Sequence, residues 1–149
     1  MTIKLEGPLS ISRVLITIAT LVYGVIPVLV DISETHAFHP DWPPHARFHM
    51  VWLLGTNSAL AVLALYLMWM SRMDGAIRVQ LAGLIGFCVY GGFIISTVTR
   101  KFYGGALVDP VGGVPPIMGM DANLLIFLPM LGLALLGLWF AHRPTQVDT

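Results

Sequence analysis

Histidines are concentrated in one short part of this chain. Four of its five histidines lie between Thr35 and His49, in a protein that is 56% hydrophobic by composition. Histidine is the side chain that most often binds a metal ion or exchanges a proton near neutral pH. Because polar, titratable groups are costly near lipid hydrocarbon, such a cluster calls for an explanation. We call residues 31–49 the histidine segment and expect any chemistry of this protein to take place there.

Two of these histidines have the spacing of a metal-binding pair on a helix. Pro43 and Pro44 favour a helix that begins near this point. His45 then falls in its first turn, and His49 lies one turn later on the same face. Two imidazole nitrogens at this spacing can bind one metal ion, and the positive helix N-terminus favours the neutral, ligand-competent imidazole. The preceding residues can add ligands, so the sequence predicts a zinc or iron centre made of His36, His39, His45, His49 and Glu34, with Asp31, Asp109 or Asp121 as further carboxylates.

Proton transfer without a metal is an alternative for the same segment. The carboxyl group of Glu34 or Asp31, removed from water near the bilayer surface, would serve as general acid, and neutral His45 or His49 as base. Such a pair suits double-bond migration, cyclisation or epoxide opening on a lipophilic molecule. The residues that we expect to contact that substrate are Trp42, Trp52, Tyr103 and Asn123.

Interpretations without chemistry also fit these residues. Histidines at an interface can be satisfied by headgroups and backbone, and aromatic side chains commonly form a belt at this depth. The zincin metalloprotease motif is not matched, because Ala46 follows His45 where that motif has glutamate. Haem ligation by two histidines would need histidines on facing spans at membrane depth, and within this chain no span other than the second contains one.

Four apolar runs must position the histidine segment. The runs are residues 14–30, 50–70, 79–99 and 122–141, and each is free of Asp, Glu, Lys, Arg and His. The mean hydropathy of the chain is +0.81, and about 20 apolar residues cross roughly 30 Å of hydrocarbon. The sequence therefore predicts one all-α domain, an integral membrane four-helix bundle. Its spans are expected at about residues 10–30, 46–70, 78–99 and 122–141.

An even number of spans places the first and third connections on the same side of the membrane. The first connection is the histidine segment, and the third runs from Tyr103 to Met120 with interleaved Gly, Pro and apolar residues. Such a loop lies in the interface or forms a lid over an amphiphilic substrate. Asp121 is expected to cap the fourth helix. In the third span, Gly91 and Gly92 either pack against a neighbouring helix or open room for a ligand.

Lysine and arginine near the span ends indicate the orientation. Lys4, Arg13, Arg72, Arg78 and Arg143 would lie on one side, and Arg47, Arg100 and Lys101 on the other. This bias predicts that both termini are cytoplasmic, in an inner or plasma membrane.

The balanced charge argues against a nucleic-acid partner. The single Cys88 allows no disulfide within the chain.

A resemblance supports this interpretation. The run Thr35-His36-x-Phe38-x-Pro40-x-Trp42-Pro43-Pro44-His45-Ala46-Arg47-Phe48-His49 resembles the signature of a family of small microbial four-helix membrane proteins of unknown function. The similarity covers this run and the four-span layout, and it implies no activity. A more general likeness connects the chain to emopamil-binding-protein-type sterol isomerases, small helical bundles with acid and histidine side chains in a lipophilic pocket. Their histidine followed four residues later by glutamate has no counterpart here.

Two functions from different classes follow. The first is a membrane-embedded enzyme that acts on a lipophilic molecule at one bilayer face, either as a metal-dependent oxidoreductase or hydrolase or as an acid–base isomerase or cyclase. The alternative is a non-catalytic subunit or binding protein that uses the histidine segment to dock a partner, which includes a second copy of the chain. An enzyme needs an enclosed polar pocket with at least two histidines and a carboxylate, whereas a docking segment directs them to solvent.

Overall fold

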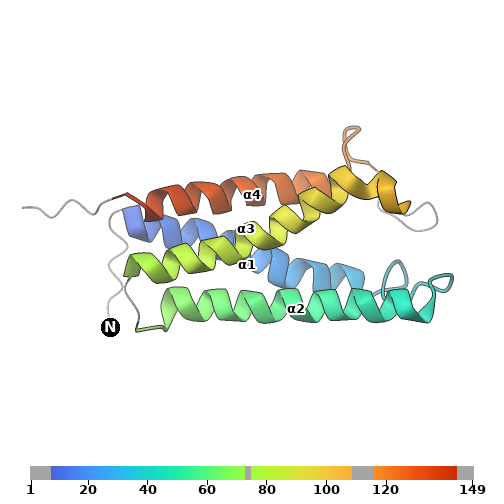
Figure 1. The fold of residues 1–149 in the computed structure, drawn as a ribbon, viewed down its shortest axis with the longest axis horizontal. Helices are drawn as coiled ribbons and strands as arrows, with labels where there is room; N and C mark the ends of the chain where they lie inside the picture. The colour runs from blue at the N-terminus through green and yellow to red at the C-terminus, as the bar shows by residue number, and fades with distance from the viewer. Residues whose placement is uncertain (1–7, 73–74, 109–115, 144–149) are drawn as a thin grey trace, which may run out of the picture.

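Four antiparallel helices of membrane-spanning length make up most of the protein. The computed structural model describes residues 8–72, 75–108 and 116–143, and within them the helices are α1 (Pro8–Asp31), α2 (Pro44–Trp69), α3 (Gly75–Thr99) and α4 (Ala122–Ala141) (Figure 1). A short 3₁₀ helix, η1 (Arg100–Tyr103), extends α3. The described residues contain no β-strand, only an isolated bridge between Ile117 and Met120. All four helices are long and apolar enough to cross a membrane, so the prediction of an all-α membrane bundle is confirmed.

Local sequence signals set the helix ends. Pro44 occupies the first turn of α2, where its missing N–H costs nothing. Asp121 caps α4 as predicted, because its carboxylate accepts hydrogen bonds from the backbone N–H groups of Asn123 (2.9 Å) and Leu124 (3.2 Å). The predicted bounds differ from the observed ones mainly at the start of α3. That helix begins at Gly75 rather than at residue 78, since it extends beyond its apolar run.

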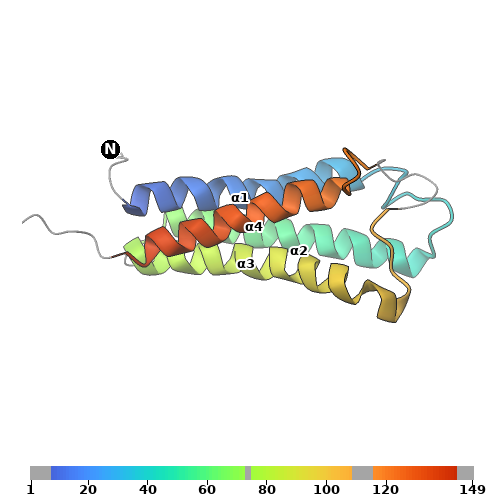
Figure 2. The ribbon, with the colours of Figure 1, turned by 90° about the horizontal axis from the view of Figure 1, so that it is seen from above.

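The helices are arranged with α1 and α3 in the middle and α2 and α4 on either side. Helix α1 packs against all three other helices, as does α3, whereas the described parts of α2 and α4 do not touch each other (Figures 1 and 2). The largest side chains buried in the core are Tyr23, Tyr90, Ile16, Met68 and Val79.

Buried hydroxyl groups tie the helices together through backbone carbonyl groups. Ser12 on α1 donates to the carbonyl oxygen of Gly137 on α4 (2.6 Å). Tyr90 on α3 donates to that of Ala19 on α1 (2.6 Å). Within hydrocarbon such bonds have no competition from water, so each helps to fix one helix against another.

Close contact between α1 and α2 depends on Gly24. A Cβ atom at Gly24 would lie 2.3 Å from the Cβ atom of Ala61 on α2. We expect Gly24→Val to lower the free energy of unfolding by about 1–3 kcal/mol, because the helices would have to separate. Gly55→Val on α2 is the matched control, since a Cβ there meets nothing within 4 Å. Thermal unfolding in detergent gives the melting temperature of each variant. Equal melting temperatures for the two variants would contradict the proposed contact.

The outer surface of the bundle carries many exposed apolar side chains. Leu29, Val62 and Val98, for example, expose 72%, 68% and 71% of their surface. Such a belt is unfavourable in water and favourable against lipid chains. This surface therefore agrees with a multi-pass membrane protein.

Candidate functional site

The histidine segment and the connection between α3 and α4 lie at the same end of the bundle. Helix α1 ends there at Asp31 and α2 begins there at Pro44, while η1 ends at Tyr103 and α4 begins at Ala122 (Figure 1). The prediction that these connections share one face is confirmed for the described residues. The predicted carboxylate Asp109 lies outside the described part of the chain.

His36 and His39 form an inner group with Asp31 and Trp42. The Nδ1 atom of His36 lies 3.7 Å from a carboxylate oxygen of Asp31, and their side chains are 28% and 21% exposed. His39 is buried, its ring is stacked on that of Trp42, and its Nδ1 accepts a hydrogen bond from the backbone N–H of Asp41 (3.2 Å). This group holds the histidine segment in place and brings one carboxylate close to one imidazole.

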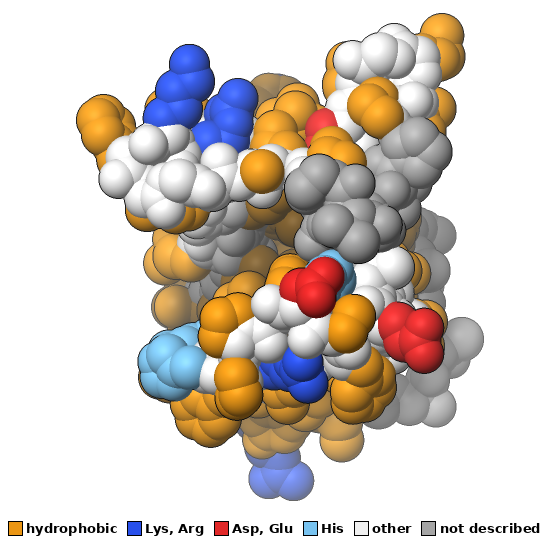
Figure 3. Space-filling view, turned by 90° about the vertical axis from the view of Figure 1, so that its right-hand side faces the viewer, with side chains coloured by type: hydrophobic (Ala, Val, Ile, Leu, Met, Phe, Trp, Pro, Cys, Tyr) orange, Lys and Arg blue, Asp and Glu red, His pale blue; other side chains and the backbone are white. Residues whose placement is uncertain are grey.

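His45 and His49 form a separate outer pair on α2. Their Nε2 atoms are 3.0 Å apart, which confirms that the two side chains share one helix face. Both residues are exposed, and the ring of His49 stacks on that of Trp52. Viewed from this end of the bundle, histidine atoms come to the surface in two separate places (Figure 3). The outer pair is therefore directed away from the helix bundle.

The predicted five-residue metal centre is not assembled. The histidines divide into the inner group and the outer pair, and Glu34 is exposed. Within residues 8–72, 75–108 and 116–143, no three His, Cys, Asp or Glu side chains come together in a way that would hold a metal ion. The predicted ligands do not converge because of the path that the chain takes before α2. Backbone hydrogen bonds from Ala37 to Asp31 and from Phe38 to Ser33 turn this segment back on itself.

The expected substrate contacts are distributed over three places. Trp42 lies against His36 and His39, and Trp52 lies beside His49. Tyr103 and Asn123 meet in a small cleft of about 170 Å³ at the end of α3, where the Tyr103 hydroxyl donates to the carbonyl oxygen of Ser96 (2.7 Å). These four residues therefore do not line one common pocket.

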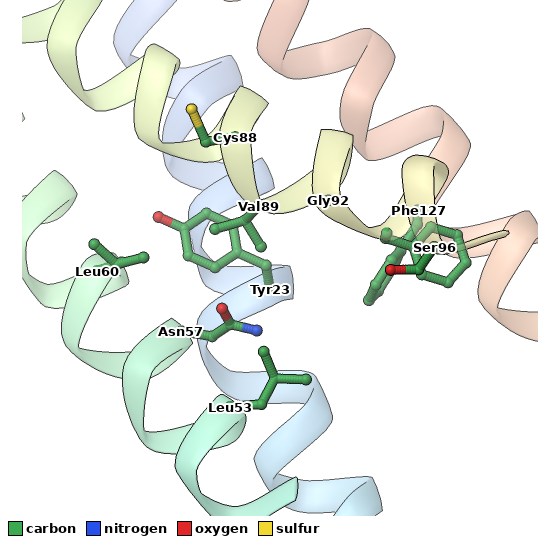
Figure 4. Close-up of a pocket in the computed structure, with 10 residues that line it drawn as sticks. Tyr23, Leu53, Asn57, Leu60, Cys88, Val89, Gly92, Ser96 and Phe127 are labelled. Atoms are coloured by element: carbon green, nitrogen blue, oxygen red, sulfur yellow. The ribbon is translucent and has the colours of Figure 1, made fainter. Parts of the chain in front are cut away.

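A larger cavity lies in the side of the bundle, between α2 and α3. Its volume is about 530 Å³, and its lining comes from all four helices (Figure 4). The lining residues are Tyr23, Leu53, Asn57, Leu60, Cys88, Val89, Gly92, Phe93, Ser96 and Phe127. None of them is a histidine or an acid. The sequence marked this place only weakly, through Asn57 within an apolar span and through the Gly91-Gly92 pair. Gly92 does line the cavity, and Gly91 does not.

One residue of the cavity lining, Tyr23, has a buried hydroxyl group for which the structure shows no partner. Tyr23 is only 1% exposed, and its hydroxyl oxygen has no hydrogen-bond partner. Thr20, one turn earlier on α1, has a buried hydroxyl in the same situation. Even if the two hydroxyls bonded to each other, one proton would remain without an acceptor. Tyr23 and Asn57 project into the space between α1, α2 and α3 (Figure 4).

A second hollow lies on α2 beside His49. It has a volume of about 300 Å³ and is lined by His49, Trp52, Leu53 and Thr56. Leu53 lines both hollows. The two hollows are thus neighbours along α2.

The described structure is thus a bundle of four helices long and apolar enough to span a membrane, with a cavity in its side. The chain belongs to the family of unknown function DUF6640, whose match covers residues 15–147 and so includes most of α1 and all of the other helices. No curated protein matches the chain, and no solved structure does.

Proposed function

We propose that this protein binds a lipophilic small molecule in the lateral cavity between α2 and α3. The observation that carries the proposal is a cavity of about 530 Å³ with a mostly apolar lining, one residue of which, Tyr23, has a buried hydroxyl without a partner. Ligand sites typically have volumes of roughly 300–1,000 Å³, with a mostly apolar lining and a few polar groups that fix the orientation. Both properties are present here.

The position of the cavity favours a ligand that arrives from the bilayer. Leu53, Cys88 and Gly92 on its lining are exposed at the side of the bundle, within the helices of membrane-spanning length. A molecule dissolved in lipid would enter there without crossing water. The Tyr23 hydroxyl favours a ligand with an oxygen that can accept a hydrogen bond, because an unpaired buried hydroxyl is costly.

The cavity is better suited to a protein that binds a ligand without converting it than to an enzyme. The cavity lining contains neither a histidine nor an acid, and His45 and His49 face away from the bundle. In this proposal the outer pair and the hollow below it offer a docking surface for a partner. The run 35–49 would then be the characteristic segment of the family. Both termini would lie in the cytoplasm of a cell with this protein in its inner or plasma membrane.

An acid–base enzyme is the second candidate, and one observation favours it. Asp31 and His36 form a partly exposed pair with 3.7 Å between carboxylate and imidazole. Such a pair can exchange a proton with the polar end of a lipophilic molecule. Conversion of an added lipophile by the wild type but not by Asp31→Asn would support this candidate, and equal conversion by both would exclude it.

Zinc or iron fits the described residues of this chain poorly. Two pairs of ligand atoms lie side by side, in His45–His49 and in Asp31–His36, and no third His, Cys, Asp or Glu of the described residues joins either pair. The proposed binding therefore involves no metal.

Cys88 allows a direct test of the cavity. It is the single cysteine of the chain, it is exposed, and it lines the cavity. Protein purified in mild detergent is extracted with organic solvent, and the extract is analysed by mass spectrometry. The molecule found is then added back, and the rate at which a lipophilic maleimide modifies Cys88 is measured. We expect a saturable decrease in that rate, of about tenfold at high occupancy.

The control protein carries its cysteine outside the cavity. In the combined variant Cys88→Ala with Gly55→Cys, the thiol lies on a part of α2 where a Cβ meets nothing within 4 Å and which does not line the cavity. The added molecule should not protect this thiol. Equal protection of both thiols, or of neither, would contradict the proposed site.

A further inference from the structure

Two arginines lie next to each other at the end of the bundle opposite the histidine segment. Arg13 is in the second turn of α1, and Arg78 is in the first turn of α3. The Nη2 atom of Arg13 lies 3.7 Å from the position that a Cβ would occupy at Gly75, the first residue of α3. Arg78 lies three residues after Gly75, on the same face of α3, so the side chains of Arg13 and Arg78 come from neighbouring positions on two helices. An anion bound between two like charges would offset their mutual repulsion.

The described part of the chain supplies no such anion. Neither guanidinium forms an ion pair with a described Asp or Glu, and the Nε atoms of both arginines are buried without a hydrogen-bond partner. One hydrogen-bond donor of Arg78 is already used, since its Nη1 donates to the carbonyl oxygen of Ser71. The acids nearest in sequence, Glu6 and Asp74, lie outside the described residues. Several guanidinium donors therefore remain for a ligand.

The surroundings of the pair are those of a membrane surface. At the same end, the guanidinium of Arg143 lies 3.5 Å from the ring centre of Trp139, and Trp69 donates its indole N–H to the Thr17 hydroxyl (3.1 Å). Tryptophan and arginine are typical of the interface where lipid headgroups lie. The anions present at that depth are the phosphate groups of lipids. A planar guanidinium binds phosphate through paired, charge-assisted hydrogen bonds.

We infer that Arg13 and Arg78 together bind the phosphate group of an anionic membrane lipid between α1 and α3. The site is independent of the lateral cavity, because none of its residues lines that cavity. A bound phosphate would neutralise the two charges and hold the starts of α1 and α3 together. The lipid would then act as a structural ligand at this end of the bundle.

The test compares lipids and one pair of variants. Delipidated protein in detergent is mixed with phosphatidylglycerol, phosphatidylcholine or inorganic phosphate, and both the melting temperature and the lipid retained in native mass spectrometry are measured. Phosphatidylglycerol should raise the melting temperature and remain bound at one molecule per chain. In Arg13→Gln, retention should fall about tenfold. Arg143→Gln, at the same end, should retain the lipid as the wild type does.

Other outcomes would overturn the inference. Equal stabilisation by both lipids, or equal retention by Arg13→Gln and the wild type, would show that the pair does not recognise the anionic headgroup. Stabilisation by millimolar inorganic phosphate alone would identify a soluble phosphate as the ligand in place of a lipid. Without lipid, Arg13→Gln should be at least as stable as the wild type, because the repulsion is removed. A loss of stability there, matched by Asp74→Asn, would indicate a counter-ion within the chain.

Discussion

Replacing Gly92 with tryptophan is expected to abolish binding of the lipophilic ligand while leaving the fold intact. A Cβ at Gly92 meets nothing within 4 Å, and this residue lines the lateral cavity. An indole ring there would occupy free volume rather than displace a neighbouring helix. Because the ligand and the ring would compete for the same space, the amount of molecule that co-purifies with the protein should fall at least tenfold.

The neighbouring glycine provides a matched control for this experiment. Gly91 precedes Gly92 on α3, its Cβ would also meet nothing within 4 Å, and it does not line the cavity. Gly91→Trp therefore adds the same ring to the same turn but not to the same space. Mass spectrometry of solvent extracts from both variants, with melting temperatures as a check of folding, gives the comparison. If both variants retained the ligand, it would have to bind elsewhere.

The helix positions were predictable because the signal for them is local. An apolar run of spanning length and the residues that flank it determine a membrane helix with little influence from the rest of the chain. The Asp121 cap is a local signal of the same kind, and it is present in the structure. The early start of α3 at Gly75 was missed, because a helix can extend past its apolar run into the headgroup region.

The arrangement of the histidine segment could be predicted only in part from such local signals. His45 and His49 share a face because helical periodicity alone brings them together. Convergence of His36 and His39 on that pair would have required a particular path for the chain before α2. That path is set by turn hydrogen bonds, such as that from Ala37 to Asp31 (2.9 Å), which leave no recognisable pattern in the sequence.

The lateral cavity depends on packing between distant residues. Gly24 and Ala61 bring α1 and α2 into contact, and Gly83 allows α3 to approach Leu138 on α4. Toward the histidine end, α3 diverges from α2 (Figure 1). A single sequence shows which residues are small but not which neighbours they face. The Gly91-Gly92 pair was therefore open to two interpretations until the structure assigned one residue to the cavity wall.

Tyr23→Phe is expected to stabilise the empty protein and weaken ligand binding at the same time. The Tyr23 hydroxyl is buried without a partner, so its removal relieves a desolvation penalty of roughly 1 kcal/mol in the ligand-free state. A ligand oxygen that accepts a hydrogen bond from this hydroxyl would lose that bond in the variant. A loss of about 1.4 kcal/mol corresponds to a tenfold weaker affinity.

Tyr90→Phe separates this effect from a general change in the core. The two rings pack edge to face with their centres 5.8 Å apart, but the Tyr90 hydroxyl already donates to the carbonyl oxygen of Ala19 (2.6 Å). Removal of that hydroxyl should lower stability by about 1 kcal/mol and leave ligand affinity unchanged. Melting temperatures without ligand should therefore change in opposite directions for the two variants, and the dissociation constant for the extracted molecule should rise only in Tyr23→Phe. A less stable Tyr23→Phe protein would mean that the hydroxyl has a partner within the chain, and the cavity would then have no polar group that selects a ligand oxygen.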